Sequence, residues 1–171
     1  MIISLLGYMG SGKTHISKNL SKKINFPSID LDQKISEEHG MTVHEIFEKK
    51  GEIYFRKEEK QILEQLLDSE KDLILSLGGG TPVYYNNIDM INEKSKSIFL
   101  RASVNTLSNR LLLQKNTRPL VSKLKDSELP EFIAKHLFER NPYYSQAHFT
   151  IDTDLKNPTE ISEKITELLQ I

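Results

Sequence analysis

The stretch "IISLLGYMGSGKT", residues 2–14, joins a short apolar run to a glycine-rich turn. Its spacing fits the phosphate-binding pattern G-x-x-x-x-G-K-[ST], with Gly7 and Gly12 as the glycines and Lys13 and Thr14 at the end. In such a loop the backbone amides surround a phosphate, the lysine reaches the terminal phosphate and the hydroxyl binds Mg²⁺. The stretch therefore predicts a strand, a phosphate-binding loop at 7–14 and a helix, in that order.

The composition excludes several classes of protein. With 171 residues the chain is expected to form one domain, 1–171, with a core of its own. Its 23 basic and 24 acidic residues give a net charge of -1, which disfavours nucleic-acid binding through bulk charge. Because the chain has no cysteine, disulfides and thiolate metal sites are excluded. No apolar run suits a membrane span or a signal peptide, so we expect a cytoplasmic protein with no membrane partner.

Short apolar runs alternate with helical patterns along the chain. Strands are expected at 2–6, 27–31, 73–77, 97–100 and 149–152. Helices are expected at 14–24, from the capping pair Thr42 and Glu45 to about residue 67, and after Asn157. This alternation predicts an α/β fold with a parallel sheet covered by helices on both faces. The polar, proline-containing stretch 115–127 is predicted to be a mobile flap.

Two acidic pairs are candidates for the chemistry beside the phosphates. "SIDLD" places Asp30 and Asp32 at the end of the second expected strand, where both side chains should leave on one face into the ligand crevice. "TIDTD", 150–154, repeats the pattern after the fifth expected strand, and the residues alone leave both pairs open. Because the chain lacks the Asn-Lys-x-Asp motif of guanine-nucleotide switches, we expect a small phosphotransferase.

The chain resembles the shikimate kinase family over essentially its whole length. The matching pieces are "GYMGSGKT" (7–14), "DLD" (30–32), "GEIYFR" (51–56), "SLGGGTP" (76–82), "TRPL" (117–120) and "RNPYYSQAHFTIDT" (140–153). The resemblance implies a three-layer P-loop kinase fold, similar to nucleoside monophosphate kinases, with five parallel strands in the order 2-3-1-4-5. It also implies a monomer in aromatic amino acid biosynthesis that transfers the γ-phosphoryl group of ATP to the 3-hydroxyl of shikimate.

The resemblance also implies a role for each matching residue. The shikimate-binding set is Asp32, Arg56, Gly78, Gly79, Gly80 and Arg140, within or beside a substrate-binding region at about 32–60. The nucleotide-binding set is Gly10, Ser11, Gly12, Lys13, Thr14, His15, Arg110 and Arg118, the last in a lid at 115–127. Mg²⁺ is expected on Thr14, with Asp30 linked to it through water. Asp32, Lys13 and Arg118 are the expected catalytic residues, and an aspartate with an ordinary pKa of about 3.9 would accept the hydroxyl proton late.

Alternatives remain open at this point. Without the resemblance, Arg56 would be interpreted as an exposed helix cation paired with Glu52 or Glu59, and Arg118 as an ordinary loop cation. A gluconate kinase would also need cations for a sugar-acid carboxylate, and a nucleoside monophosphate kinase is a more distant possibility. A nucleotide-regulated binding protein would have the phosphate loop but little turnover.

Overall fold

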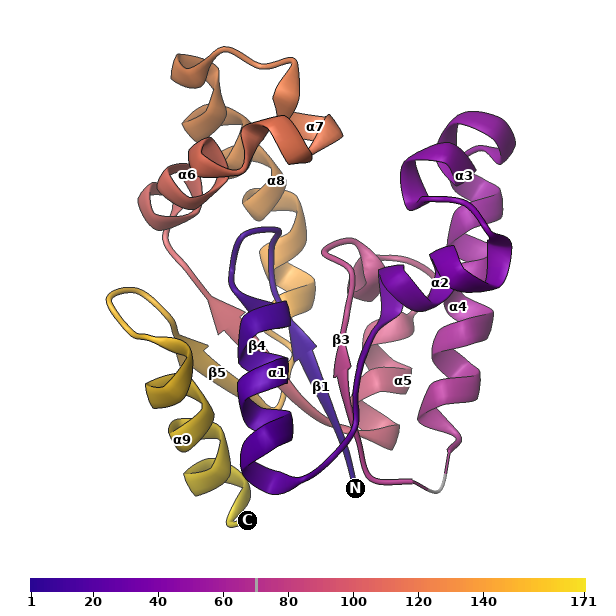
Figure 1. The fold of residues 1–171 in the computed structure, drawn as a ribbon, viewed down its shortest axis with the longest axis vertical. Coiled ribbons are helices and arrows are strands. Elements are labelled where there is room, and N and C mark those ends of the chain that lie inside the picture. Colours follow the sequence, from indigo (N-terminus) through magenta and orange to yellow (C-terminus); the bar gives the residue numbers. More distant parts are fainter. Residues whose placement is uncertain (70) are drawn as a thin grey trace.

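The computed structural model describes residues 1–69 and 71–171 (Figure 1). Five parallel strands form one sheet in the order β2-β3-β1-β4-β5, which confirms the predicted fold class. The strands are β1 (Ile2–Leu6), β2 (Ser28–Asp30), β3 (Leu73–Ser76), β4 (Lys96–Arg101) and β5 (Phe149–Asp152). Every residue of the central strand β1 is buried, as expected for a parallel strand that helices cover on both sides.

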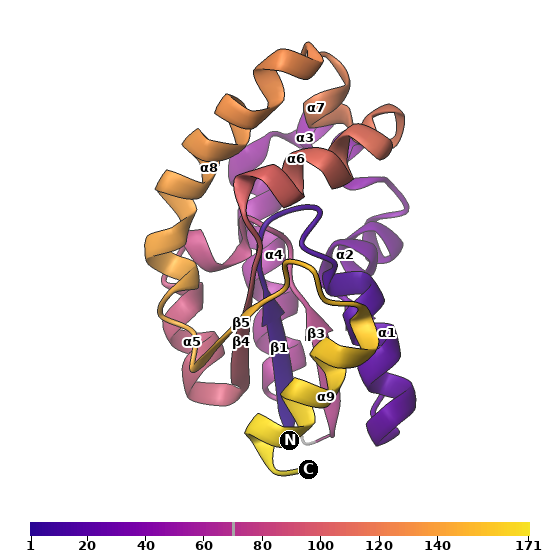
Figure 2. The ribbon, with the colours of Figure 1, turned by 90° about the vertical axis from the view of Figure 1, so that its left-hand side faces the viewer.

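Helices cover both faces of this sheet (Figures 1 and 2). They are α1 (Lys13–Ile24), α2 (Leu31–His39), α3 (Val43–Lys50), α4 (Glu52–Leu67), α5 (Asn87–Lys94), α6 (Val104–Leu113), α7 (Pro119–Ser122), α8 (Leu129–Tyr144) and α9 (Pro158–Leu169). Ile3 and Leu5 of β1 pack with residues of α1 and α9, whereas Ile2 and Leu6 belong to the cluster that includes α4, α5 and α8. Alternate residues of one strand therefore enter two separate cores.

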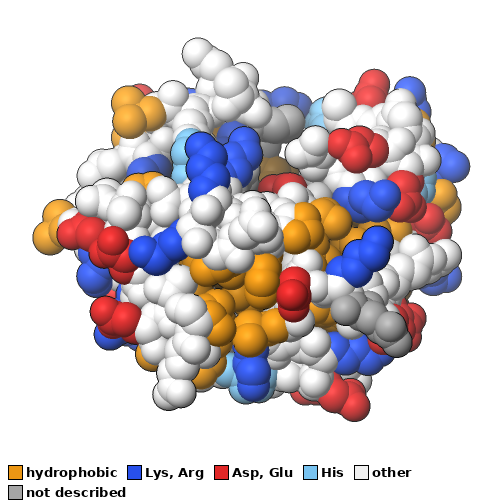
Figure 3. Space-filling model, turned by 60° about the horizontal axis from the view of Figure 1, so that its bottom comes forward, with side chains coloured by type: hydrophobic (Ala, Val, Ile, Leu, Met, Phe, Trp, Pro, Cys, Tyr) orange, Lys and Arg blue, Asp and Glu red, His pale blue; other side chains and the backbone are white. Residues whose placement is uncertain are grey.

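The phosphate loop lies at the carboxyl end of the sheet, between two arms (Figure 1). One arm consists of α2, α3 and the start of α4, and the other consists of α6, α7 and the start of α8. The opposite end carries both termini and apolar side chains, which Figure 3 shows gathered on that face. Half-buried Ile24, Phe26 and Leu169 belong to this end and pack against the α1–α9 core. Within the described residues, no helix has the length and apolar character needed to cross a bilayer.

The structure differs from the local predictions at three places. The helix expected from Thr42 to about residue 67 is divided at Gly51. This residue has a φ of 85°, and it lies between the end of α3 and the start of α4. Helix α2 was not predicted, and Asp32 lies in its first turn rather than on a strand. The expected flap at 115–127 is not an uninterrupted loop, because it contains α7 between the 3₁₀ turns η2 (Lys115–Thr117) and η3 (Asp126–Glu128).

The predicted helix starts were confirmed where a capping box was present. The Glu45 amide donates to Thr42 Oγ1 at 3.1 Å, and the Thr42 amide donates to Glu45 Oε2 at 2.8 Å. Asn157 and Glu160 form the same reciprocal arrangement at the start of α9. These contacts are local in the sequence, which is why spacing alone revealed them.

Candidate active site

The phosphate loop connects β1 to α1 through backbone conformations that favour glycine. Gly12 is the N-cap of α1 with φ 94° and ψ 9°, and no side chain caps the helix. The first amides of α1 are therefore available to an anion, and the helix dipole favours negative charge at this position. Lys13 is 9% exposed, and its Nζ donates to Gly7 O at 2.7 Å and Tyr8 O at 3.0 Å. Its ammonium group thus lies across the loop.

A cavity of about 550 Å³ brings most of the predicted site together. Its lining includes residues 10–15 at the end of the loop and the start of α1, Asp30, Asp32, residues 76–79, Arg110 and Arg118. Arg110 Nη1 donates to Gly10 O at 3.1 Å, and Arg118 Nε donates to Gln114 Oε1 at 3.1 Å. Arg118 therefore faces the same cavity as the phosphate loop, and it reaches this cavity from the arm that contains α6 and α7.

Asp30 links the phosphate loop to the start of α2. Its Oδ2 accepts from Thr14 Oγ1 at 3.3 Å, while its Oδ1 accepts from the amides of Asp32 at 3.1 Å and Gln33 at 3.3 Å. Oxygen donors of this kind suit Mg²⁺, which keeps most of its ligands as water and phosphate oxygens. The described part of the chain contains no group of three or more His, Cys, Asp or Glu side chains that could hold a metal. Thr14 and Asp30 thus fit a Mg²⁺ held mainly by phosphate.

The second acidic pair has structural partners instead. Asp152 accepts from Arg101 Nε at 2.5 Å and Arg101 Nη2 at 2.9 Å, which links the ends of β4 and β5. Asp154 accepts from the amide of Ser103 at 3.1 Å, next to the start of α6. Neither of the two aspartates lines the cavity, whereas Asp30 and Asp32 both do. The tertiary structure thus distinguishes pairs that sequence spacing could not rank.

Asp32 lies in an environment that disfavours its charged form. Burial, followed by the neighbouring carboxylates of Glu59 and Asp30, raises its pKa to about 6, against the opposing effects of Lys13 and Arg56. This pKa lies above the value of about 3.9 that is ordinary for an aspartate. Burial also lowers the pKa of Lys13 to about 8, although Asp32 and Asp30 oppose this shift. The two groups thus titrate closer to neutrality than they would in water.

The glycine run Gly78–Gly79–Gly80 faces three charged side chains in turn. A Cβ on Gly78 would lie 2.7 Å from Asp32 Oδ1, and one on Gly79 would lie 3.1 Å from Arg140 Nη1. A Cβ on Gly80 would lie 2.5 Å from Arg56 Nη2. A Cβ at position 78 or 80 would therefore clash with a charged group, and one at position 79 would make an unusually tight contact.

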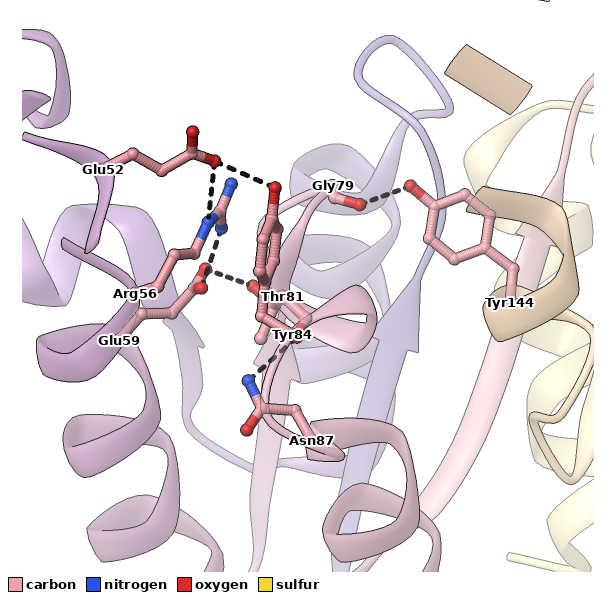
Figure 4. Close-up of polar contacts among 8 residues, drawn as sticks. All are labelled: Glu52, Arg56, Glu59, Gly79, Thr81, Tyr84, Asn87 and Tyr144. Carbon is pink, nitrogen blue, oxygen red and sulfur yellow. Dashed lines mark hydrogen bonds and ion pairs between the residues drawn. The ribbon is translucent and has the colours of Figure 1, made fainter. Parts of the chain in front are cut away.

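Arg56 is buried rather than exposed. It is 9% exposed, and its Nη1 donates at 2.8 Å to Glu59, which is 0% exposed (Figure 4). Glu59 also accepts from Thr81 Oγ1 at 2.6 Å. The interpretation of Arg56 as a surface cation was therefore wrong, although it named the correct partner. Each of the two buried charges stabilises the other, because removal of one would leave the other buried without a counter-charge and would destabilise the folded protein.

Arg140 approaches the glycine run from α8. It is half-buried, and its Cζ lies 5.4 Å from the centroid of the Tyr8 ring. Tyr144, one turn later, donates its hydroxyl to Gly79 O at 2.5 Å (Figure 4). Helix α8 thus contacts both the phosphate loop and the glycine run.

Comparisons with known proteins show the family to which the chain belongs. The protein-family model described as shikimate kinase matches residues 9–170. The chain belongs to the shikimate kinase family. A shikimate kinase of Flavobacterium psychrophilum is 49% identical over 168 residues, which cover 98% of each chain. The crystal structure of a Bacteroides thetaiotaomicron shikimate kinase is 37% identical with a TM-score of 0.94, covering 100% of this chain and 99% of that one. A shikimate kinase of Acinetobacter baumannii, solved in complex with shikimate, is 30% identical with a TM-score of 0.89 and coverages of 99% and 92%.

Membership of the shikimate kinase family decides among the functional alternatives. The chain is an ATP-using shikimate kinase, so the gluconate kinase, nucleoside monophosphate kinase and nonenzymatic alternatives are not supported. Four residues around the cavity and Arg56 were given no role from the sequence. Lys156 and Pro158 line the cavity, Thr81 donates to Glu59 beside Arg56, and Tyr84 stacks on Arg56. Glu59 was named from its spacing of three residues from Arg56 on a helix, whereas these four have no such signal.

Proposed function

We propose that this kinase transfers the γ-phosphoryl group of ATP to the 3-hydroxyl of shikimate, with Asp32, Arg56 and Arg140 around the glycine run as its shikimate site. The observation that carries this proposal is the opposition of each glycine at 78–80 to one of these three side chains. Two guanidinium groups and one carboxylate beside a backbone free of side chains suit a small hydroxylated acid. An arginine fork can bind a carboxylate through two parallel charge-assisted hydrogen bonds.

Asp32 has the position and the ionisation state for contact with the accepting hydroxyl. It lines the same cavity as Lys13 and Thr14, and its pKa of about 6 leaves it largely ionised at neutral pH. As the hydroxyl oxygen bonds to the γ-phosphorus and the bond to the ADP oxygen breaks, the hydroxyl proton passes to the Asp32 carboxylate. Phosphoryl transfer passes through a loose transition state, so alignment by Asp32 matters more than its strength as a base.

Cations around the phosphates would stabilise the transition state of phosphoryl transfer. Lys13 and Arg118 would carry the charge that develops on the phosphoryl group, and Arg110 and His15 would contact the nucleotide beside residues 10–14. Thr14 would hold Mg²⁺ directly and Asp30 through water, and the ion when bound neutralises phosphate charge. The stretch 115–127 would act as a lid, because it presents Arg118 to the cavity from the arm opposite the substrate-binding region at 32–60.

A coupled assay of ADP release tests the proposal. Purified protein is supplied with MgATP and, separately, with shikimate, gluconate or AMP, and shikimate alone should support rapid ADP formation. The product should be shikimate 3-phosphate by phosphorus NMR, and chelation of Mg²⁺ should abolish turnover reversibly. Equal ADP release with and without shikimate would refute the proposal, as would phosphorylation at another hydroxyl.

We extend the proposal to the oligomeric state. A single chain contains both the phosphate loop and all three charged groups of the shikimate site, so the enzyme should act as a monomer. Light scattering coupled to gel filtration should give a mass close to that of one 19.7 kDa chain. A dimer that persists on dilution to assay concentration would contradict this part.

A further inference from the structure

Tyr84 lies at the rim of the glycine run and contacts Arg56 in two ways. It ends the 3₁₀ turn η1 (Thr81–Val83) and is 37% exposed. Its ring centroid lies 4.3 Å from Arg56 Cζ, and its hydroxyl donates to Glu52 Oε1 at 2.9 Å (Figure 4). The same Glu52 oxygen lies 3.6 Å from Arg56 Nε. Tyr84 therefore holds the guanidinium directly with its ring and indirectly through Glu52.

The remaining surroundings of Arg56 fix one edge of its guanidinium group. Glu59 binds Nη1 at 2.8 Å, and the rings of Phe55 and Phe47 have centroids 5.1 and 5.8 Å from Cζ. Nη2 makes no hydrogen bond to any of the described residues. It lies next to Gly80, where an added Cβ would be 2.5 Å away. The Nη2 edge is thus the part of the group that is presented to the glycine run.

Tyr84 and Glu52 are more exposed than Glu59 and Phe55, which also surround Arg56. Glu59 and Phe55 are 0% and 2% exposed, so their loss would disturb the core as well as the site. Tyr84 and Glu52 lie at the surface, and the Glu52 side chain is 53% exposed. Exposed residues contribute little to packing, and the contacts of these two converge on a buried cation. Their contacts therefore serve to orient that cation more than to stabilise the fold.

We propose that Tyr84 is a positioning residue, which holds the plane of the Arg56 guanidinium so that its Nη2 edge meets the shikimate carboxylate. The inference rests on the proposed function. A carboxylate binds an arginine fork only when the two planes align, so a guanidinium held in advance loses less conformational freedom on binding. Tyr84 supplies this order through an aromatic face, which attracts the cation without occupying any of its N–H groups. Glu52 completes the arrangement by taking up the Tyr84 hydroxyl beside Nε.

Steady-state kinetics with Tyr84 variants test this role. Tyr84→Ala should raise the KM for shikimate about tenfold, which is the size of a partly desolvated cation–π contact, and leave kcat and the KM for ATP within about threefold. Tyr84→Leu, which keeps bulk but has no aromatic face, should resemble Tyr84→Ala. Tyr84→Phe keeps the face and should restore KM to within about threefold of wild type. Tyr85→Ala is the matched control, because Tyr85 is also exposed, at 46%, and should leave KM unchanged.

The outcomes separate this inference from the proposed function. Calorimetric titration with shikimate gives the affinity directly, and circular dichroism verifies that each variant is folded. If wild-type enzyme binds and phosphorylates shikimate but Tyr84→Ala has an unchanged KM, only the positioning role is wrong. The same conclusion follows if Tyr84→Leu matches wild type, or if kcat falls while KM stays constant. If wild-type enzyme neither binds nor phosphorylates shikimate, the proposed function fails, and this inference fails with it.

Discussion

Substitution of Asp32 by asparagine should make the protein more stable at neutral pH while removing its activity. The raised pKa of Asp32 means that the folded state disfavours the carboxylate, because burial and the charges of Glu59 and Asp30 oppose ionisation. Asparagine has nearly the same shape and stays neutral at every pH. Asp32→Asn should therefore remove an electrostatic cost from the folded protein, together with the carboxylate proposed to accept the hydroxyl proton.

The expected gain in stability follows from the pKa shift of Asp32. The pKa rises from 3.8 to about 6 on folding. At about 1.36 kcal/mol per unit, the ionised carboxylate costs roughly 3 kcal/mol of folding free energy at neutral pH. Well below pH 3.8 the carboxyl is protonated in both the folded and the unfolded state, so the cost is absent. It develops as the pH rises from 3.8 to about 6 and levels off above that, because there the folded protein must also ionise.

Urea denaturation of both proteins between pH 4 and 7.5 measures this effect. The free energy of unfolding of Asp32→Asn, relative to wild type, should rise by up to about 3 kcal/mol across the range, while kcat/KM falls at least about a hundredfold. Asp152→Asn is the control with the opposite sign. The hydrogen bonds from Arg101 lower the pKa of Asp152, so that variant should lose stability relative to wild type as the pH rises. A stability difference for Asp32→Asn that does not change with pH would refute the reasoning.

Three further predictions concern the charged groups around the cavity. Because burial lowers the pKa of Lys13 to about 8, MgADP binding at pH 8 should take up about half a proton, measured by calorimetry in buffers of different ionisation enthalpy. Lys13→Met should abolish that proton uptake. Uptake that persists in this variant would show that the proton does not bind to Lys13. Arg118→Ala should lower kcat at least about a hundredfold with little change in shikimate KM, because its contact forms mainly in the transition state; a pure KM effect would contradict the role. Glu59→Gln should lower the free energy of unfolding by about 3 kcal/mol and raise shikimate KM, because it leaves the buried Arg56 without a counter-charge. Unchanged urea stability of that variant would disprove this account of the pair.

The features that could be predicted from the sequence are those encoded in neighbouring residues. The phosphate loop depends on glycines and a lysine within residues 7–14, and the capping boxes at Thr42 and Asn157 join residues three apart. Strands were found because a fully covered parallel strand is a short apolar run. The break at Gly51 was missed because a glycine inside a helical pattern is compatible with either a continuous or a divided helix.

The surroundings of the charged residues could not be predicted in this way. Arg56 and Glu59 have the spacing of an ordinary surface ion pair on a helix, and only the packing of Thr81 and Tyr84 against them buries the pair. The raised pKa of Asp32 likewise depends on Glu59, which is distant in the sequence. Burial and long-range charge are properties of the assembled chain, so local spacing does not determine them.

By itself, the sequence determined that this chain is an α/β protein with a phosphate-binding loop, because loop geometry and strand burial depend on residues close together along the chain. Only the tertiary structure decided which aspartates face the cavity, and that each glycine at 78–80 meets one charged side chain. The physical reason is distance. Asp32, Arg56 and Arg140 come from separate helices, and only the folded sheet brings their charges to the same short stretch of backbone.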